Sequence, residues 1–113
     1  MRRKYGVPFA FTPISRVFLD DWLPELNEAE LKCQLYVYRR TYGTPRRQRE
    51  AQITYAEFVK HTGRPRTNVY RALASLKAKG LLKVGGPANG TRTYEILFRR
   101  NTEKLFVMKP KIS

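Results

Sequence analysis

The chain of 113 residues contains a single cysteine, Cys33, and a single histidine, His61. One cysteine excludes an intramolecular disulfide and a zinc site built from several cysteines, and it favours a reducing compartment. Long apolar runs are also missing, because no stretch of about 18 apolar residues occurs and the first residues lack the apolar segment of a signal peptide. The sequence therefore predicts a soluble cytoplasmic protein without a membrane span, with Cys33 in its core.

Catalytic groups are scarce as well. His61 falls at the end of a short expected helix, where a histidine usually interacts with the helix dipole. Five of the nine acidic residues lie between positions 20 and 30, at expected helix ends, where they indicate ordinary helix-terminal charge or, alternatively, a protein-docking edge. Because no combination of nucleophile, base and oxyanion donor emerges, we expect no enzyme activity, no cofactor and no metal.

What the chain has in excess is positive charge. It contains 23 Lys and Arg residues against nine Asp and Glu, which gives a net charge of +14. The excess lies in residues 31–113, which hold 19 basic and four acidic groups, whereas residues 1–30 hold four and five. A polyanionic partner is therefore expected ahead of an acidic membrane surface, with the nucleic-acid side after residue 30.

The segment 61–80 predicts a turn followed by a cationic helix. Gly63 suits a tight turn with positive φ, Pro65 suits the first helical position, and Gly80 suits a left-handed C-cap. One face of this helix is an apolar stripe of Val69, Ala72, Leu73 and Leu76, and the opposite face consists of Thr67, Arg71, Ala74 and Ala78, with Asn68 and Ser75 on one flank. Small side chains with a few donors fit the roughly 12 Å major groove of DNA, so we interpret the segment as a recognition helix. The alternative is a basic surface helix without a partner.

A second expected helix is apolar on two sides. Asn27 and Glu30 have the spacing of a capping box, and the helix is expected to run to about Tyr42. One stripe contains Leu31, Leu35, Tyr38 and Tyr42, and the other contains Cys33, Tyr36 and Val37. Such a helix is usually sandwiched between two layers. The covering layer is expected to be the segment 9–23, with a short helix over 16–23 capped by Ser15 and ended before Pro24, or alternatively a second copy of the protein.

The remaining elements complete a recognisable order. Thr54 and Glu57 repeat the capping-box spacing after a short strand at Ile53 and predict a helix over 55–61. Segments 81–84 and 91–98 are β-prone, and the glycine-rich segment 85–90 between them predicts a hairpin turn. This order is that of a winged helix-turn-helix, a mainly α fold with a small β-hairpin (α+β). We expect a single domain with an arm over 1–13, a body over 14–98 and a basic tail over 99–113.

Several of these segments resemble a known family. Arg39-Arg-Thr-Tyr-Gly43, Ile53-Thr-Tyr-Ala-Glu-Phe58 and Val69 to Leu82 resemble the N-terminal domain of phage replication protein O, and the chain is also similar to DnaD-type replisome organisers of phages and plasmids. The resemblance covers about residues 13–84. It implies a replication initiator domain that binds duplex origin sites and, as part of a longer protein, recruits a replicative helicase or its loader. Its recognition-helix positions match Arg66, Thr67, Asn68 and Arg71.

The expected DNA contacts divide by chemistry. Arg71 would read guanine and Asn68 adenine, each worth about 1–3 kcal/mol, with Thr67 and Ala74 against thymine methyl groups and Ser75 as a further donor. The phosphate contacts, which set register without reading sequence, are expected from Arg46, Arg47, Arg64, Arg66, Lys83 and Arg92. Arg92 is also a candidate for insertion into the minor groove.

Three other functions fit parts of the sequence. A winged-helix transcription regulator would use the same readout as a replication initiator. A self-assembly or protein-interaction module would form a homodimer or higher oligomer, with Cys33, Tyr36 and Val37 at the interface. RNA binding would require exposed aromatic residues for base stacking, for which Tyr70 is the only support.

Overall fold

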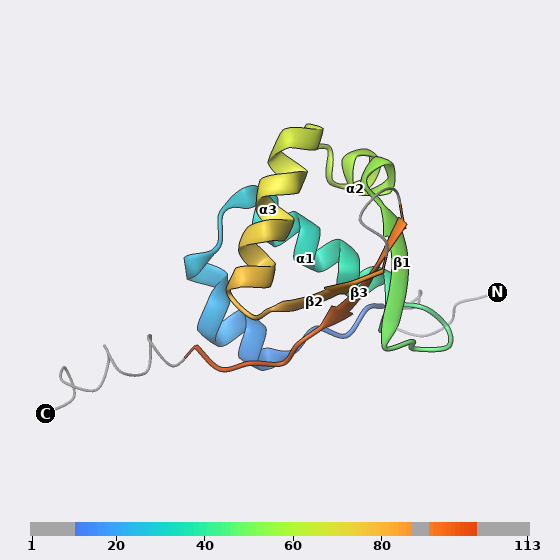
Figure 1. The fold of residues 1–113 in the computed structure, drawn as a ribbon. Helices are drawn as coiled ribbons and strands as arrows, with labels where there is room; N and C mark the ends of the chain where they lie inside the picture. Colours follow the sequence, from blue (N-terminus) through green and yellow to red (C-terminus); the bar gives the residue numbers. More distant parts are fainter. Residues whose placement is uncertain (1–10, 87–90, 102–113) are drawn as a thin grey trace, which may run out of the picture.

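A computed structural model describes residues 11–86 and 91–101 (Figure 1). The expected arm before residue 11, the hairpin tip at 87–90 and the tail after residue 101 lie outside the described residues. The elements follow the order α1 (Glu28–Arg40), β1 (Glu50–Thr54), α2 (Tyr55–Thr62), α3 (Arg66–Ala78), β2 (Leu82–Gly85) and β3 (Thr91–Ile96), preceded by a π-helix (Phe18–Trp22) and a 3-10 turn (Leu23–Glu25). The prediction of a mixed α+β fold is confirmed.

The three strands form one antiparallel sheet in the order β1-β3-β2. The short strand predicted at Ile53 therefore joins the β2–β3 hairpin as a third strand. In the register, Thr54 pairs with Thr91 at one end of the sheet and Glu50 pairs with Glu95 at the other. The start of β3 thus lies at the end of the sheet where β1 leads into α2, and the connection 41–49 lies at the opposite end (Figure 1).

Both predicted capping boxes are present. The Glu30 N–H donates to Asn27 Oδ1 over 2.8 Å, and the Asn27 N–H donates to Glu30 Oε1 over 2.9 Å. Thr54 and Glu57 make the same reciprocal pair at the start of α2. Each box satisfies two backbone donors that the first turn of a helix leaves without partners.

The glycines that flank α3 behave as predicted. Gly63 ends α2 with φ of 71°, and Gly80 follows α3 with φ of 80°. Both values lie in the left-handed region, which glycine adopts without a steric penalty. Pro65 is the N-cap residue in an extended conformation, so α3 begins at Arg66, one residue later than expected.

The N-terminal helical segment (16–25) covers α1, as the favoured alternative predicted. The Phe18 ring packs against Tyr38 with ring centres 5.6 Å apart. Cys33 and Val37 are fully buried inside the protein, and burial raises the pKa of the Cys33 thiol to about 12. The interface expected at Cys33, Tyr36 and Val37 for a second copy is therefore wrong for two of its three residues.

The geometry of this segment differs from the expected α-helix. The Leu23 N–H donates to Phe18 O, five residues back, which makes Phe18–Trp22 a π-helix. Pro24 does not end the helical chain, because it lies at the start of the 3-10 turn, where a missing N–H leaves no hydrogen bond unmade. The π-helix ends at Trp22, and the chain continues through the 3-10 turn before α1 begins.

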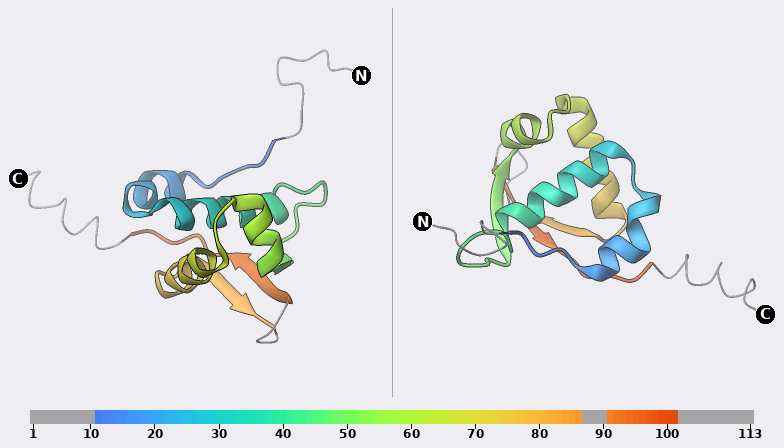
Figure 2. Two further views of the ribbon diagram at one scale, coloured as in Figure 1. Left: turned by 90° about the horizontal axis from the view of Figure 1, so that it is seen from above. Right: turned by 180° about the vertical axis from the view of Figure 1, so that it is seen from behind.

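The beginning of the expected basic tail is docked on this segment. The Trp22 indole donates to Arg99 O over 2.7 Å, and the buried Asp21 carboxylate accepts the Asn101 N–H over 2.9 Å. Figure 2 shows the chain after β3 running beside the N-terminal helical segment, with α1 between that segment and the layer of α3 and the sheet. Among the described residues, no helix combines the length and the apolar character needed to cross a membrane.

Candidate nucleic-acid interface

The outer face of α3 is open, as the helical periodicity predicted. Val69, Ala72, Leu73 and Leu76 are buried in the core, whereas Thr67, Arg71, Ala74 and Ala78 are exposed. The open face therefore combines three small side chains with one long cationic donor. Small side chains allow another surface to approach the helix closely, and the guanidinium of Arg71 can extend from it.

The two flanks of α3 differ in composition. The flank that faces α1 is the one that contains carboxylates, and we call it the acidic flank. A hollow of about 430 Å³ lies between the two helices, and its charged lining consists of Glu28 and Glu30 together with Arg64 and Arg71, with Asn68 and Ser75 beside them. The Ser75 hydroxyl donates to Glu30 Oε2, and Lys79 Nζ lies 2.8 Å from the same oxygen. Ser75 therefore connects α3 to α1, and its expected role as a donor to DNA is wrong because its hydrogen is used within the protein.

Glu30 links the start of α1 to the end of α3 by charge. Burial raises its pKa, but hydrogen bonds from Lys79, Ser75 and the Asn27 N–H outweigh burial and hold the pKa below the ordinary value of 4.5. The folded protein therefore binds the proton of this carboxyl less tightly than the unfolded chain does. The resulting stabilisation is complete above the ordinary pKa and is lost as the pH falls through the folded-state pKa.

We expect Glu30→Gln to reduce the loss of stability in acid. Glutamine keeps an oxygen that can accept the Asn27 N–H, but it has no proton to gain as the pH falls. Urea unfolding at about pH 7 and about pH 3 measures the difference in unfolding free energy for the wild-type protein and the variant. An equal difference for the two proteins would show that Glu30 does not contribute to acid unfolding.

Arg64 also lies on the acidic flank. Its side chain is half-buried, and Nη1 lies 3.5 Å from Glu28 Oε1, which belongs to a carboxylate that also pairs with Lys32 over 3.0 Å. The positive charge of Arg64 is thus partly balanced inside the protein. A phosphate contact by Arg64 would have to replace the Glu28 pair, which makes this residue a weaker candidate than the sequence suggested.

The flank of α3 that faces the β2–β3 hairpin is aromatic and cationic. A hollow of about 180 Å³ lies there, and its lining includes Tyr55, Tyr70, Lys77 and Arg92. The guanidinium carbons of Arg66 and Arg92 lie 4.8 Å and 5.9 Å from the centre of the Tyr55 ring. The Tyr70 ring, which is 57% exposed, meets Tyr55 edge-on at 6.4 Å. We call this hollow, with Arg66 beside it, the tyrosine groove.

The tyrosine groove changes the interpretation of Arg92. It also adds Tyr55 and Lys77, which the sequence analysis did not select, and Tyr70, which the sequence analysis named only for RNA binding. Arg92 lies on the same side of β3 as the buried Tyr94, folded over Tyr55, so the structure does not support its expected insertion into a minor groove. Tyr70 and Lys77 are seven residues apart, a spacing that places both on one flank of α3 and could have identified them. No sequence spacing identified Tyr55, because the side chains that contact its ring belong to α3 and β3, far along the chain from α2.

Two expected phosphate-binding sites lie away from α3. Lys83 alternates with the inward residues Leu82 and Val84 and pairs in register with Glu95, so it is on the outer face of the hairpin. Arg46 and Arg47 are exposed in the connection at the far end of the sheet, and both figures show this connection apart from α3. The expected phosphate contacts of Arg46 and Arg47 stay a prediction, and they would lie apart from the α3 surface.

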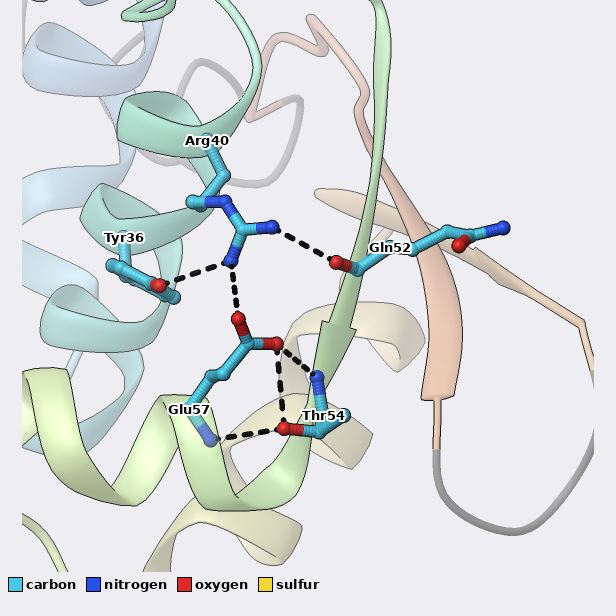
Figure 3. A network of polar contacts seen from close by, with 5 residues as sticks. All are labelled: Tyr36, Arg40, Gln52, Thr54 and Glu57. Carbon is cyan, nitrogen blue, oxygen red and sulfur yellow. Dashed lines mark hydrogen bonds and ion pairs between the residues drawn. The ribbon is translucent and has the colours of Figure 1, made fainter.

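A hydrogen-bond network holds α2 against α1 and β1 (Figure 3). Arg40 Nη1 donates to Tyr36 Oη over 3.0 Å and to Glu57 Oε2 over 3.1 Å, while Nη2 donates to Gln52 O over 3.0 Å. The Thr54 N–H and the guanidinium of Arg40 lower the pKa of Glu57 despite its partial burial. The network joins α1, β1 and α2, and it thereby positions the turn that leads into α3.

His61 adds a ring contact to the same region. Its imidazole stacks on Tyr36 with ring centres 4.7 Å apart and planes 11° apart.

Within the described part of the chain, no group of three or more His, Cys, Asp or Glu residues could hold a metal ion. No protein-family model, curated protein or solved structure matches this chain.

Proposed function

We propose that the protein is a winged-helix protein that binds double-stranded DNA, with α3 as the recognition helix and the β2–β3 hairpin as the wing. The observation that carries this proposal is the open face of α3, where Thr67, Arg71 and Ala74 are exposed on a helix whose other side is core. The order α1-β1-α2-α3-β2-β3 with a three-stranded sheet supports it, since a winged helix has this arrangement. The net charge of +14 supports a polyanionic ligand.

In this proposal, Arg71 reads a guanine through its O6 and N7 atoms. Arginine forms two hydrogen bonds to these atoms in the major groove, and a good pair of this kind discriminates against the wrong base by about 1–3 kcal/mol. Asn68 is half-buried in the hollow between α1 and α3. It can therefore read an adenine only at the edge of the DNA major groove that lies closest to α1. Thr67 and Ala74 leave room for thymine methyl groups.

Selection of bound duplexes from a random library tests this proposal, and Arg71→Ala tests its mechanism. We expect Arg71→Ala to bind the selected duplex about 10-fold to 100-fold more weakly and to lose the preference at one base pair. Arg16→Ala removes the same charge from the exposed surface of the N-terminal helical segment and serves as the control. Equal affinity of the Arg71→Ala variant and the wild-type protein for the selected duplex would contradict the reading role.

A role in replication is the narrower proposal, and it is supported by the resemblance alone. The Arg39 to Gly43 element of that resemblance serves the fold: the buried Thr41 hydroxyl donates to Val37 O over 2.7 Å, and a Cβ on Gly43 would lie 2.8 Å from Arg39 O. The arrangement of the selected sites separates the alternatives. Direct repeats would support an origin-binding initiator, whose partner in a longer protein would be a replicative helicase or its loader, whereas a palindrome would support a dimeric transcription regulator.

A further inference from the structure

We propose that the tyrosine groove is a seat for one phosphodiester group of the DNA backbone, and that Tyr55 is the positioning residue for the two arginines that hold it. This inference rests on the proposed DNA binding and specifies which flank of α3 the backbone follows. The strand lies along the flank that faces the β2–β3 hairpin, and the acidic flank that faces α1 stays free of phosphate.

The charges around α3 support this choice of flank. Arg66 at the start of α3, Lys77 near its end and Arg92 on β3 bring three cations to the groove from two elements. Of the described residues that line it, none is a carboxylate. The opposite hollow contains Glu28 and Glu30 beside Arg64 and Arg71, and its cations are partly balanced there, since Glu28 pairs with Arg64 and Glu30 with Lys79. The hollow beside these cations has a volume of about 180 Å³.

Tyr55 gives the two arginines a common support. Both guanidiniums lie within the distance at which a cation interacts with an aromatic face, which limits the rotamers of two long side chains before any ligand arrives. An arginine side chain loses rotamer entropy when it binds a ligand, and an arginine that is already ordered loses less of it. The capping box that begins α2 at Thr54 fixes the backbone next to Tyr55.

The same contacts favour a phosphate over a stacked base as the occupant. A base that stacked on Tyr55 would compete with the guanidinium of Arg66, which already lies 4.8 Å from the ring centre. Tyr70 meets Tyr55 edge-on, so the two rings do not form parallel platforms for successive bases. A phosphate instead binds at the edges of guanidiniums, because arginine binds phosphate oxygens with two parallel N–H donors.

Salt dependence measured on substitutions that leave the charge unchanged tests the seat. Fluorescence anisotropy with a labelled duplex of about 24 base pairs between 50 and 200 mM NaCl gives the slope of log affinity against log salt, which changes by about 0.9 for each phosphate contact. We expect Tyr55→Phe to bind like the wild-type protein. We expect Tyr55→Leu, which removes the ring, to bind about tenfold or more weakly with a slope smaller by about one. In an Arg66→Ala/Arg92→Ala background, Tyr55→Leu should have no further effect.

Circular dichroism and thermal unfolding show whether Tyr55→Leu is folded, since Tyr55 is half-buried. The exposed Lys77 provides a second test that does not require Tyr55→Leu to fold. Lys77→Ala should lower the slope by about one, whereas Arg16→Ala, in the N-terminal helical segment, should leave it unchanged. If Lys77→Ala and a folded Tyr55→Leu keep the wild-type slope, the phosphate seat is overturned and DNA binding stands. If the wild-type protein binds no duplex, both proposals are overturned.

Discussion

Raising NaCl from 50 to 200 mM is expected to weaken duplex binding by about tenfold. Each cation that neutralises a phosphate releases condensed counterions, and the gain from this release falls as the salt concentration rises. The cations at the tyrosine groove are Arg66 and Arg92, which hold one phosphate together, and Lys77, which can reach a second. Two phosphate contacts give a slope of about −1.8 and thus the expected decrease over this range of salt. An affinity that hardly changes over this range would contradict the proposed interface.

A pair of double variants separates contact from net charge. Arg66→Ala/Arg92→Ala and Arg46→Ala/Arg47→Ala each remove two positive charges, so the net charge of the protein changes equally. Only the first pair lies at the tyrosine groove, while the second lies at the far end of the sheet. We expect the first double variant, which loses the single phosphate seat, to lower the salt slope by about one and the second to keep the wild-type slope. Equal slopes for the two would show that the groove makes no phosphate contact.

Phe58→Ala is expected to destabilise the protein by about 3–5 kcal/mol. Phe58 is fully buried in α2, and its ring meets Tyr36 of α1 at 5.6 Å and Tyr94 of β3 at 5.1 Å. Removing this ring leaves a cavity where three elements join, and the surrounding rings can fill it only in part. Since a domain of this size has roughly 5–15 kcal/mol of stability, the loss would be a large fraction of the total.

Thermal unfolding provides the measurement, with an expected decrease in Tm of roughly 15–30 °C. Phe11→Ala removes the same ring from a position where the side chain is 68% exposed, and it is expected to change the stability by less than about 0.5 kcal/mol. A Tm of the Phe58→Ala variant close to that of Phe11→Ala would mean that Phe58 does not hold α2 to the rest of the core.

Local signals predicted the helices well because the interactions behind them span only a few residues. The capping boxes at Asn27 and Thr54 are three-residue patterns, and both form as expected. The left-handed glycines 63 and 80 are likewise local, since the absence of a Cβ decides which conformations are open. The π-helix over Phe18–Trp22 was not predicted, because a π-helix and an α-helix bury similar faces over one turn and differ only in their hydrogen bonds.

The candidate site was predicted only where periodicity along one helix was sufficient. The open face around Arg71 follows from the 3.6-residue repeat of α3. Ser75 looked equally suitable, but its partner, Glu30, is 45 residues earlier in the chain. Arg92 was expected near the hairpin tip, and its position over Tyr55 depends on how β3 packs against the start of α2. Partners separated by this many residues leave no pattern in a single sequence.

The amino-acid sequence alone determined the positive charge, the helix boundaries near their caps and the apolar stripe that turns one side of α3 towards the core. Composition and short-range spacing decide such features, since each depends on neighbours within about one or two helical turns. Tertiary packing decided that the two flanks of α3 have opposite character, with Glu30 of α1 on one and Tyr55 of α2 on the other. That difference arises because burying the apolar stripe brings distant segments against both edges of the helix, and it determines where a phosphate can approach.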